Sequence, residues 1–126
     1  MSDPAATAVL LIAHGSRNIE ANADTHFLAE QIRKQGRFAH VAEAFLEQAE
    51  PDIETAAAQC VAGGAKRVVL LPHFLSAGVH VKRDLTTFQK RLAERFAGVD
   101  FVLAEPIGQH PLLLGILEDR IREATE

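Results

Sequence analysis

The sequence predicts a three-layer α/β sandwich in which helices cover both faces of a four-stranded parallel sheet. Residues 8–13 form an apolar run without polar alternation, which is typical of a strand buried on both faces. A second apolar run, residues 68–72, lies in the third predicted strand, residues 67–72. Four strand-like segments alternate with four helix-like segments, and right-handed crossovers join such units into a parallel sheet. The expected strand order is 2-1-3-4, a small flavodoxin-like sheet.

The first half of the chain supplies two of these β/α units. Residues 18–35 carry a modest apolar face and are followed by Gly36, which predicts a helix after the first strand. Residues 39–45 alternate between apolar and polar side chains, which indicates a strand nearer the sheet edge. Pro51 stands where the first position of the next helix is expected. The apolar stripe of that helix repeats at helical spacing up to Gly63: Ile53, Ala56, Ala57, Cys60 and Val61.

The second half supplies the other two units. Residues 73–81 are expected to form a loop after the third strand, and the negative charge of Asp84 is expected to favour the start of the following helix. Residues 99–104 predict the fourth strand. Pro111 opens the last helix, whose core side is expected to use four apolar residues: Leu113, Ile116, Leu117 and Ile121.

Length and composition indicate one globular domain over residues 1–126. No apolar run approaches the length of a membrane span, and the amino terminus lacks the pattern of a secretory signal. The single cysteine, Cys60, cannot form an internal disulfide, which agrees with the reducing cytoplasm. The formal net charge of −4 argues against a nucleic-acid partner, since such domains usually present a basic surface.

Candidate metal ligands follow three of the predicted strands. Open parallel sheets bind ligands at the carboxyl ends of their strands, beside the switch point in strand order. His14 follows the first strand, Glu47 follows the second, and His80 lies in the loop after the third. Imidazole and carboxylate groups bind first-row transition metals, and three protein ligands leave positions open for a substrate. We therefore expect His14, Glu47 and His80 to form an open metal site.

Four loop segments carry a family resemblance: residues 14–17 (HGSR), 45–51 (FLEQAEP), 72–81 (PHFLSAGVHV) and 105–111 (EPIGQHP). In this order, and over nearly the whole chain, they resemble the short, single-domain sirohydrochlorin chelatases of the CbiX type, a branch of the class II tetrapyrrole chelatases. The resemblance implies that His14 and His80 bind the metal and that Glu47 serves as a metal ligand or takes up a proton. It also implies a homodimer of chelatase halves.

The reaction implied by the resemblance is insertion of a divalent metal into sirohydrochlorin, in cobalamin or siroheme biosynthesis. Cobalt is favoured, with ferrous iron or nickel as alternatives. The metal is a substrate, and no permanently bound cofactor is expected. Because the tetrapyrrole carries many carboxylates and the chain is net acidic, local polar and cationic residues must bind it. The candidates beside the proposed ligands are Ser16, Arg17, Lys82 and Arg83.

Two other readings stay open. In a phosphoryl-transfer enzyme, His14 would be the nucleophile and Arg17 would hold the phosphate. Against this, Ala13 stands where histidine phosphatases have an arginine before the nucleophile, and no phosphate-binding loop of the G-x-x-x-x-G-K-[ST] type is present. The second reading is a binding module that carries a metal or a tetrapyrrole without joining them. Ser16 has a structural alternative as well, as the N-cap of the first helix.

Overall fold

Four parallel strands form one sheet in the order β2-β1-β3-β4, which confirms the predicted topology. The computed structural model describes residues 6–75, 78–108 and 110–126. In it the strands are β1 (Thr7–Ala13), β2 (His40–Phe45), β3 (Arg67–Pro72) and β4 (Asp100–Leu103). The switch point therefore falls between β1 and β3, as expected.

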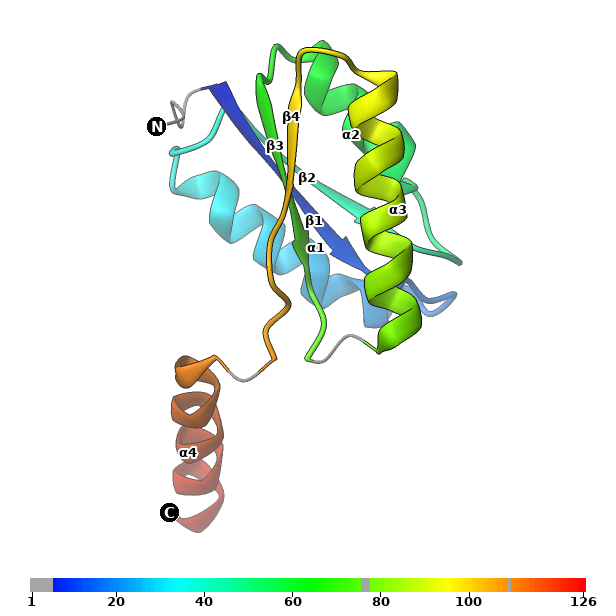
Figure 1. The fold of residues 1–126 in the computed structure, drawn as a ribbon. Helices are drawn as coiled ribbons and strands as arrows, with labels where there is room; N and C mark the ends of the chain where they lie inside the picture. The colour runs from blue at the N-terminus through cyan, green and yellow to red at the C-terminus, as the bar shows by residue number, and fades with distance from the viewer. Residues whose placement is uncertain (1–5, 76–77, 109) are drawn as a thin grey trace.

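One helix follows each strand: α1 (Ile19–Lys34), α2 (Ile53–Ala62), α3 (Val79–Arg95) and α4 (Pro111–Thr125). Helix α1 lies on one face of the sheet, while α2 and α3 lie on the other (Figure 1). No helix in the described part of the chain combines the length and apolar character that crossing a bilayer requires.

Strand β1 is buried along its whole length because it contributes to a core on each face. Ala8, Leu10 and Ile12 belong to the large cluster with α2 and α3, whereas Val9 and Leu11 pack toward α1. This alternation follows from the period of a strand and explains why the apolar run is continuous. The buried Cys60 thiol lies in the larger cluster, and burial raises its pKa to about 11, so it stays protonated and unreactive at neutral pH.

Helix α2 begins later than the sequence predicted. The Glu50–Pro51 peptide bond is cis, and Asp52 is the N-cap of a helix whose first residue is Ile53. The Asp52 carboxylate accepts a hydrogen bond from the Thr55 backbone amide at 2.8 Å. The assignment of Pro51 to the first helical position was therefore wrong, because the aspartate cap sets the start of the helix.

Replacing Asp52 with alanine should lower the free energy of unfolding by about 1 kcal/mol at neutral pH. Hydrogen bonds from Thr55 hold the pKa of Asp52 below its ordinary value of 3.8. The stabilisation by the charged cap is therefore present above that value and is lost as pH falls through the lowered pKa. Urea unfolding at a series of pH values checks this. Asp52→Asn is the matched control, because it keeps a capping oxygen that does not titrate, and equal stability of wild type and Asp52→Ala at neutral pH would contradict the assignment.

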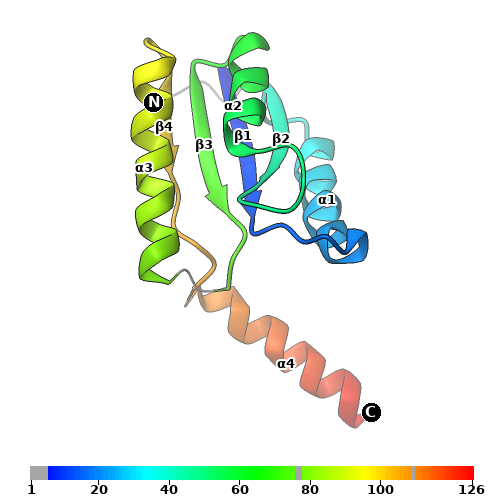
Figure 2. The ribbon, with the colours of Figure 1, turned by 90° about the vertical axis from the view of Figure 1, so that its right-hand side faces the viewer.

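The two remaining differences concern α3 and α4. Helix α3 has Gly78 as its N-cap and begins at Val79, so His80 lies in its first turn and not in the predicted loop of residues 73–81. The first turn has no acidic residue, and Asp84 lies too far into the helix for its charge to favour the helix start as expected. Helix α4 has no buried residue, so its predicted core side does not face the core of its own chain. Figure 2 shows α4 projecting away from the sheet.

Candidate functional site

The loops after β1 and β2 are joined by backbone hydrogen bonds that continue the parallel ladder beyond the strands. The Leu46 amide donates to the Ala13 carbonyl at 2.9 Å, and the Glu47 amide donates to the His14 carbonyl at 3.0 Å. His14 and Glu47 are thus adjacent because their two strands are neighbours in the sheet. This contact depends on the strand order β2-β1 and not on sequence proximity.

Gly15 makes the close approach of these loops possible. Its φ is +91°, and a Cβ at this position would lie 1.9 Å from the backbone oxygen of Glu47. A side chain would therefore meet both an unfavourable backbone conformation and a backbone atom that cannot rotate away. The glycine of the His-Gly-Ser sequence is required by the geometry that brings His14 beside Glu47.

A cavity of about 360 Å³ opens at this edge of the sheet, between the two loops and α3. The loops contribute His14, Leu46 and Glu47 to its lining, and α3 contributes Val81, Asp84, Thr87, Phe88 and Arg91. The polar lining combines an imidazole, two carboxylates and one guanidinium. Such a set can attract a hydrated divalent cation and can also bind a carboxylate of an organic substrate.

The His14 side chain is exposed at the cavity and packs against Phe74. The two ring centroids are 4.7 Å apart with an angle of 61° between the ring planes, which is an edge-to-face arrangement. Phe74 is itself buried, so it provides a fixed surface for the imidazole. The histidine is thereby oriented by packing while it stays accessible to a metal ion from solvent.

His80 does not line this cavity. It is exposed in the first turn of α3, and the next residue, Val81, is the one that reaches the lining. Within residues 6–75, 78–108 and 110–126, no three His, Cys, Asp or Glu side chains are close enough together to hold a metal ion. The structure thus brings together His14 and Glu47 but not the complete predicted set, and the role of His80 as a ligand stays a prediction.

Ser16 takes part in a local turn. Its hydroxyl accepts a hydrogen bond from the Asn18 amide at 3.0 Å, and its own amide donates to the Asn22 side chain at 3.0 Å. The N-cap of α1 is Asn18, so the structural alternative for Ser16 as N-cap was wrong. Because the Ser16 amide already has a partner, an anion at this helix start would have to compete with Asn22.

The predicted cationic residues do not line the cavity that His14 and Glu47 share. Arg17 and Arg83 are exposed and do not line it, and Lys82 lines a separate cavity of about 210 Å³ beside Pro72 and Glu105. The cation that lines the cavity shared by His14 and Glu47 is Arg91, which the sequence analysis did not identify. Helical spacing could have identified Arg91, because it lies on the same face of α3 as three other lining residues. These are Asp84, Thr87 and Phe88, which lie seven, four and three positions before it.

Two further histidines have structural partners. The Nδ1 atom of His73 lies 3.3 Å from the buried Thr25 hydroxyl, in a cavity of about 250 Å³ on the other side of His14. The Nδ1 atom of His110 accepts a hydrogen bond from the Leu112 amide at 3.1 Å and caps α4. His14 therefore lines two cavities, whereas His110 caps the start of α4.

The sheet order and the site together define a class of protein. A 2-1-3-4 parallel sheet with an exposed imidazole and carboxylates in an open cavity at its carboxyl edge is suited to transient metal binding, because among the described residues no closed set of ligands surrounds that cavity.

Comparison with known proteins gives the family. The CbiX family model matches residues 8–124, and the chain belongs to the CbiX family. It is 35% identical over 117 residues to a chloroplastic sirohydrochlorin ferrochelatase of Arabidopsis thaliana, covering 93% of this chain and 52% of that protein. It is 31% identical to a sirohydrochlorin cobaltochelatase of Methanopyrus kandleri, covering 93% of this chain and 96% of that protein.

The fold matches that of a solved chelatase. The sirohydrochlorin chelatase SirB from Bacillus subtilis subspecies spizizenii, in complex with cobalt, superposes with a TM-score of 0.84 at 28% identity, covering 93% of this chain and 50% of that one. The chain thus spans about half the length of the Arabidopsis and Bacillus proteins and nearly all of the Methanopyrus protein.

Proposed function

We propose that this protein inserts a divalent metal ion into sirohydrochlorin, with residues 1–126 acting as one chelatase domain within a homodimer. The observation that carries the proposal is the shared cavity of His14 and Glu47, built by the backbone hydrogen bonds between their loops. Family membership supports it, since relatives over nearly the full chain are named sirohydrochlorin cobaltochelatase and ferrochelatase. The cytoplasmic location expected from the sequence stays a prediction.

Metal insertion requires a partly dehydrated ion and an acceptor for two pyrrole N–H protons. In our proposal the neutral His14 imidazole holds the ion, and the cavity carboxylates replace part of its water shell. Glu47 lies beside His14 and either completes the coordination or takes one pyrrole proton as general base. Every pyrrole proton that Glu47 does not take passes to water at the open cavity. His80, one residue before the lining residue Val81, would supply the second imidazole as the macrocycle docks.

Cobalt is the metal we favour, with ferrous iron or nickel as the alternatives. An imidazole with carboxylates accepts all three ions, whose affinities follow the general first-row order more than details of the sequence. The relatives support cobalt and iron, because one is named a cobaltochelatase and another a ferrochelatase. Comparison of insertion rates with the three ions measures which metal the protein prefers.

The test is metallation of sirohydrochlorin followed by absorbance, with and without the protein. Cobalt and ferrous ions should be inserted faster than in the uncatalysed reaction, with many turnovers per protein. A spectral change that stops at one equivalent of protein indicates a carrier module instead. No change in rate or spectrum with any of the three ions would contradict the proposal.

Reversing the charge of Arg91 should weaken substrate binding more than it slows turnover. The Arg91 guanidinium lines the cavity 5.8 Å from the Phe88 ring centroid, and its exposed ion pair with Glu54 is long at 3.8 Å, so a substrate carboxylate can compete for it. We expect Arg91→Glu to raise KM about tenfold, about 1.4 kcal/mol, with a smaller effect on kcat.

Arg95→Glu is the matched control for Arg91→Glu. Both arginines pair with Glu54, at 3.3 Å for Arg95 and 3.8 Å for Arg91, but Arg95 does not line the cavity. Arg17→Glu, Lys82→Glu and Arg83→Glu test the cations predicted from the sequence. An equal rise in KM for Arg95→Glu and Arg91→Glu would mean that overall charge, and not the cavity, determines binding.

A further inference from the structure

A second cavity borders His14 on the α1 side of the sheet. Its volume is about 250 Å³, and its polar lining comes from the loop after β1, from α1 and from His73 in the loop after β3. His14 lines this cavity as well as the one that it shares with Glu47. A substrate bound at His14 is therefore in reach of both cavities.

The sheet fixes the position of His73. Its backbone amide donates to the Ile12 carbonyl at 2.7 Å, which continues the β1–β3 ladder beyond the end of β3. Leu71, two positions earlier, packs in the cluster under α1, and strand alternation directs His73 to the same face. There its Nδ1 atom lies 3.3 Å from the Thr25 hydroxyl. The residue is thus held both at its backbone and at its ring.

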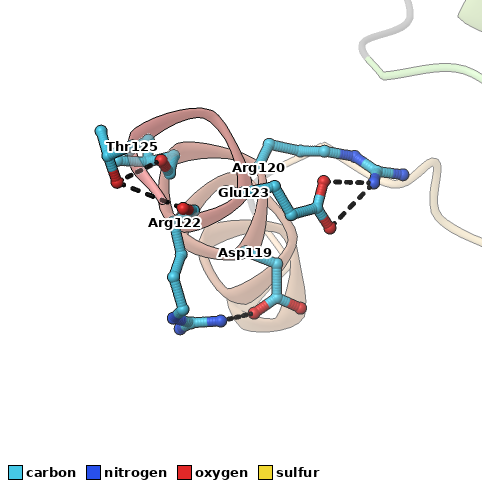
Figure 3. Close-up of polar contacts among 6 residues, drawn as sticks. Asp119, Arg120, Arg122, Glu123 and Thr125 are labelled. Carbon is cyan, nitrogen blue, oxygen red and sulfur yellow. Dashed lines mark hydrogen bonds and ion pairs between the residues drawn. The ribbon is translucent and has the colours of Figure 1, made fainter.

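The Thr25 hydroxyl depends on His73 for its hydrogen bond. Thr25 is only 3% exposed, and a buried hydroxyl needs an acceptor for its hydrogen. Exposed threonines of α3 and α4 donate to backbone carbonyls instead: Thr86 to Lys82, Thr87 to Arg83 and Thr125 to Ile121, the last of which Figure 3 shows. In the part of the chain that the structure describes, Thr25 makes no such bond, so its hydroxyl donates to Nδ1 of His73.

This hydrogen bond determines which ring nitrogen of His73 carries a hydrogen. A neutral imidazole has one N–H group and one bare nitrogen. Because Nδ1 accepts from Thr25, the hydrogen lies on Nε2, which is the ring nitrogen left for the cavity. In this tautomer Nε2 can neither ligate a metal ion nor take up a proton. His73 therefore offers the cavity a hydrogen-bond donor.

Two further side chains of the lining keep hydrogens that they can donate. The Ser16 hydroxyl accepts from the Asn18 amide and retains its own hydrogen. The Asn22 side-chain amide uses one of its two hydrogens on the Ser16 carbonyl, at 2.9 Å. Neutral donors of this kind suit a carboxylate, which is only an acceptor. Asp24 also lines the cavity, and its negative charge opposes such a ligand.

We infer that this cavity binds one carboxylate arm of the tetrapyrrole, with His73 as the donor and Thr25 as the residue that positions its ring. The inference rests on the proposed function and deepens it by adding a substrate contact on the α1 side. Arg91 would bind another carboxylate in the cavity on the α3 side. Contacts on both sides of His14 would orient the macrocycle relative to the metal.

Binding of metal-free sirohydrochlorin to the full chain, followed by absorbance, tests the role of His73. His73→Leu should raise the Kd about tenfold, because it removes a hydrogen bond to a charged group. His73→Gln keeps an N–H donor and should recover most of this loss. The KM for the metal should stay within about twofold of the wild-type value in both variants, since Nε2 is not a metal ligand.

Thr25→Val and Thr25→Ser test the positioning of the ring. Valine removes the hydroxyl, so the hydrogen of the ring can move to Nδ1, and the Kd should rise about threefold. Serine restores the hydroxyl and should give the wild-type Kd. Nitrogen-15 NMR of the imidazole reports the tautomer without substrate. We expect a bare Nδ1 in the wild type and in Thr25→Ser, and a mixture of tautomers in Thr25→Val.

Asp24→Asn should change the Kd in the opposite direction. It removes a negative charge from the lining, so the Kd for sirohydrochlorin should fall about twofold. Glu20→Gln is the matched control, because it makes the same change of charge at an exposed position of α1 that does not line the cavity. It should leave the Kd unchanged. A higher Kd for Asp24→Asn would contradict a carboxylate as the ligand.

The outcomes separate this inference from the proposed function. An unchanged Kd for His73→Leu overturns the carboxylate site, and a hydrogen on Nδ1 of the wild-type ring overturns the role of Thr25. A wild type that does not bind sirohydrochlorin overturns both. Metal insertion with no effect of these variants would leave the proposed function standing, whereas the expected pattern of Kd values without metal insertion would do the reverse.

Discussion

Replacing His14 with alanine is expected to reduce metal insertion by about a hundredfold or more while leaving the fold intact. The imidazole is exposed at the cavity beside Glu47 and contacts the core only through the edge-to-face packing with Phe74. Loss of an outer-sphere partner alone costs metal sites about 10- to 100-fold, and loss of a direct ligand should cost more. The free energy of unfolding should change by no more than about 0.5 kcal/mol, as for other surface positions.

Two further histidine variants make this result specific. His80→Ala should lose most activity if the second imidazole joins the metal when substrate binds. His40→Ala is the control, because His40 opens β2 at the opposite end of the sheet from the cavity. Wild-type rates for His14→Ala would contradict the proposed site, whereas wild-type rates for His80→Ala alone would restrict the site to His14 and Glu47.

Replacing Gly15 with alanine should lower both stability and activity. The positive φ costs a non-glycine residue about 1–2 kcal/mol. Moving the Glu47 backbone away from the new Cβ breaks the hydrogen bond from the Glu47 amide to the His14 carbonyl, which is worth about 1 kcal/mol more. We expect a loss of about 2–3 kcal/mol in the free energy of unfolding, measured by urea denaturation. Insertion activity should fall further than the loss of folded protein explains, because the loops of His14 and Glu47 must separate.

Gly98→Ala separates backbone strain from the loop contact. Its φ is +89°, nearly the same as that of Gly15, but no atom lies within 4 Å of the position of a Cβ. This variant should lose only the conformational part of the stability, about 1–2 kcal/mol, and keep its activity per folded molecule. Equal effects of the two variants would mean that the approach to Glu47 does not matter.

The sheet was predictable from its apolar runs, of which β1 is buried along its whole length, whereas β3 alternates between buried and partly buried residues. The apolar runs at β1 and β3 have no polar alternation, and four β/α units leave few right-handed topologies. The start of α2 was misjudged because a proline and an aspartate both favour a helix start, and the Asp52 cap determined it. The burial of α4 was misjudged because helical periodicity identifies an apolar face but not the surface that covers it.

The candidate site was predictable only in part. The positions of His14 and Glu47 follow from the strand order, since both residues come directly after adjacent strands. Arg91 lies eleven residues after His80, and its place at the cavity depends on which face α3 turns toward the loops. That orientation is set by the packing of Leu85 and Leu92 into the core, which the sequence alone does not connect to the site.

The backbone ladder between His14 and Glu47 has a consequence for metal selectivity. In the proposed metal site it fixes where two side chains originate, while no third potential ligand converges on them in the described part of the chain. The backbone would therefore impose neither an ionic radius nor a ligand number. A change of preferred ion then needs no remodelling of the scaffold. Substitution of a few side chains around the opening, or a different supply of ions in the cell, is sufficient.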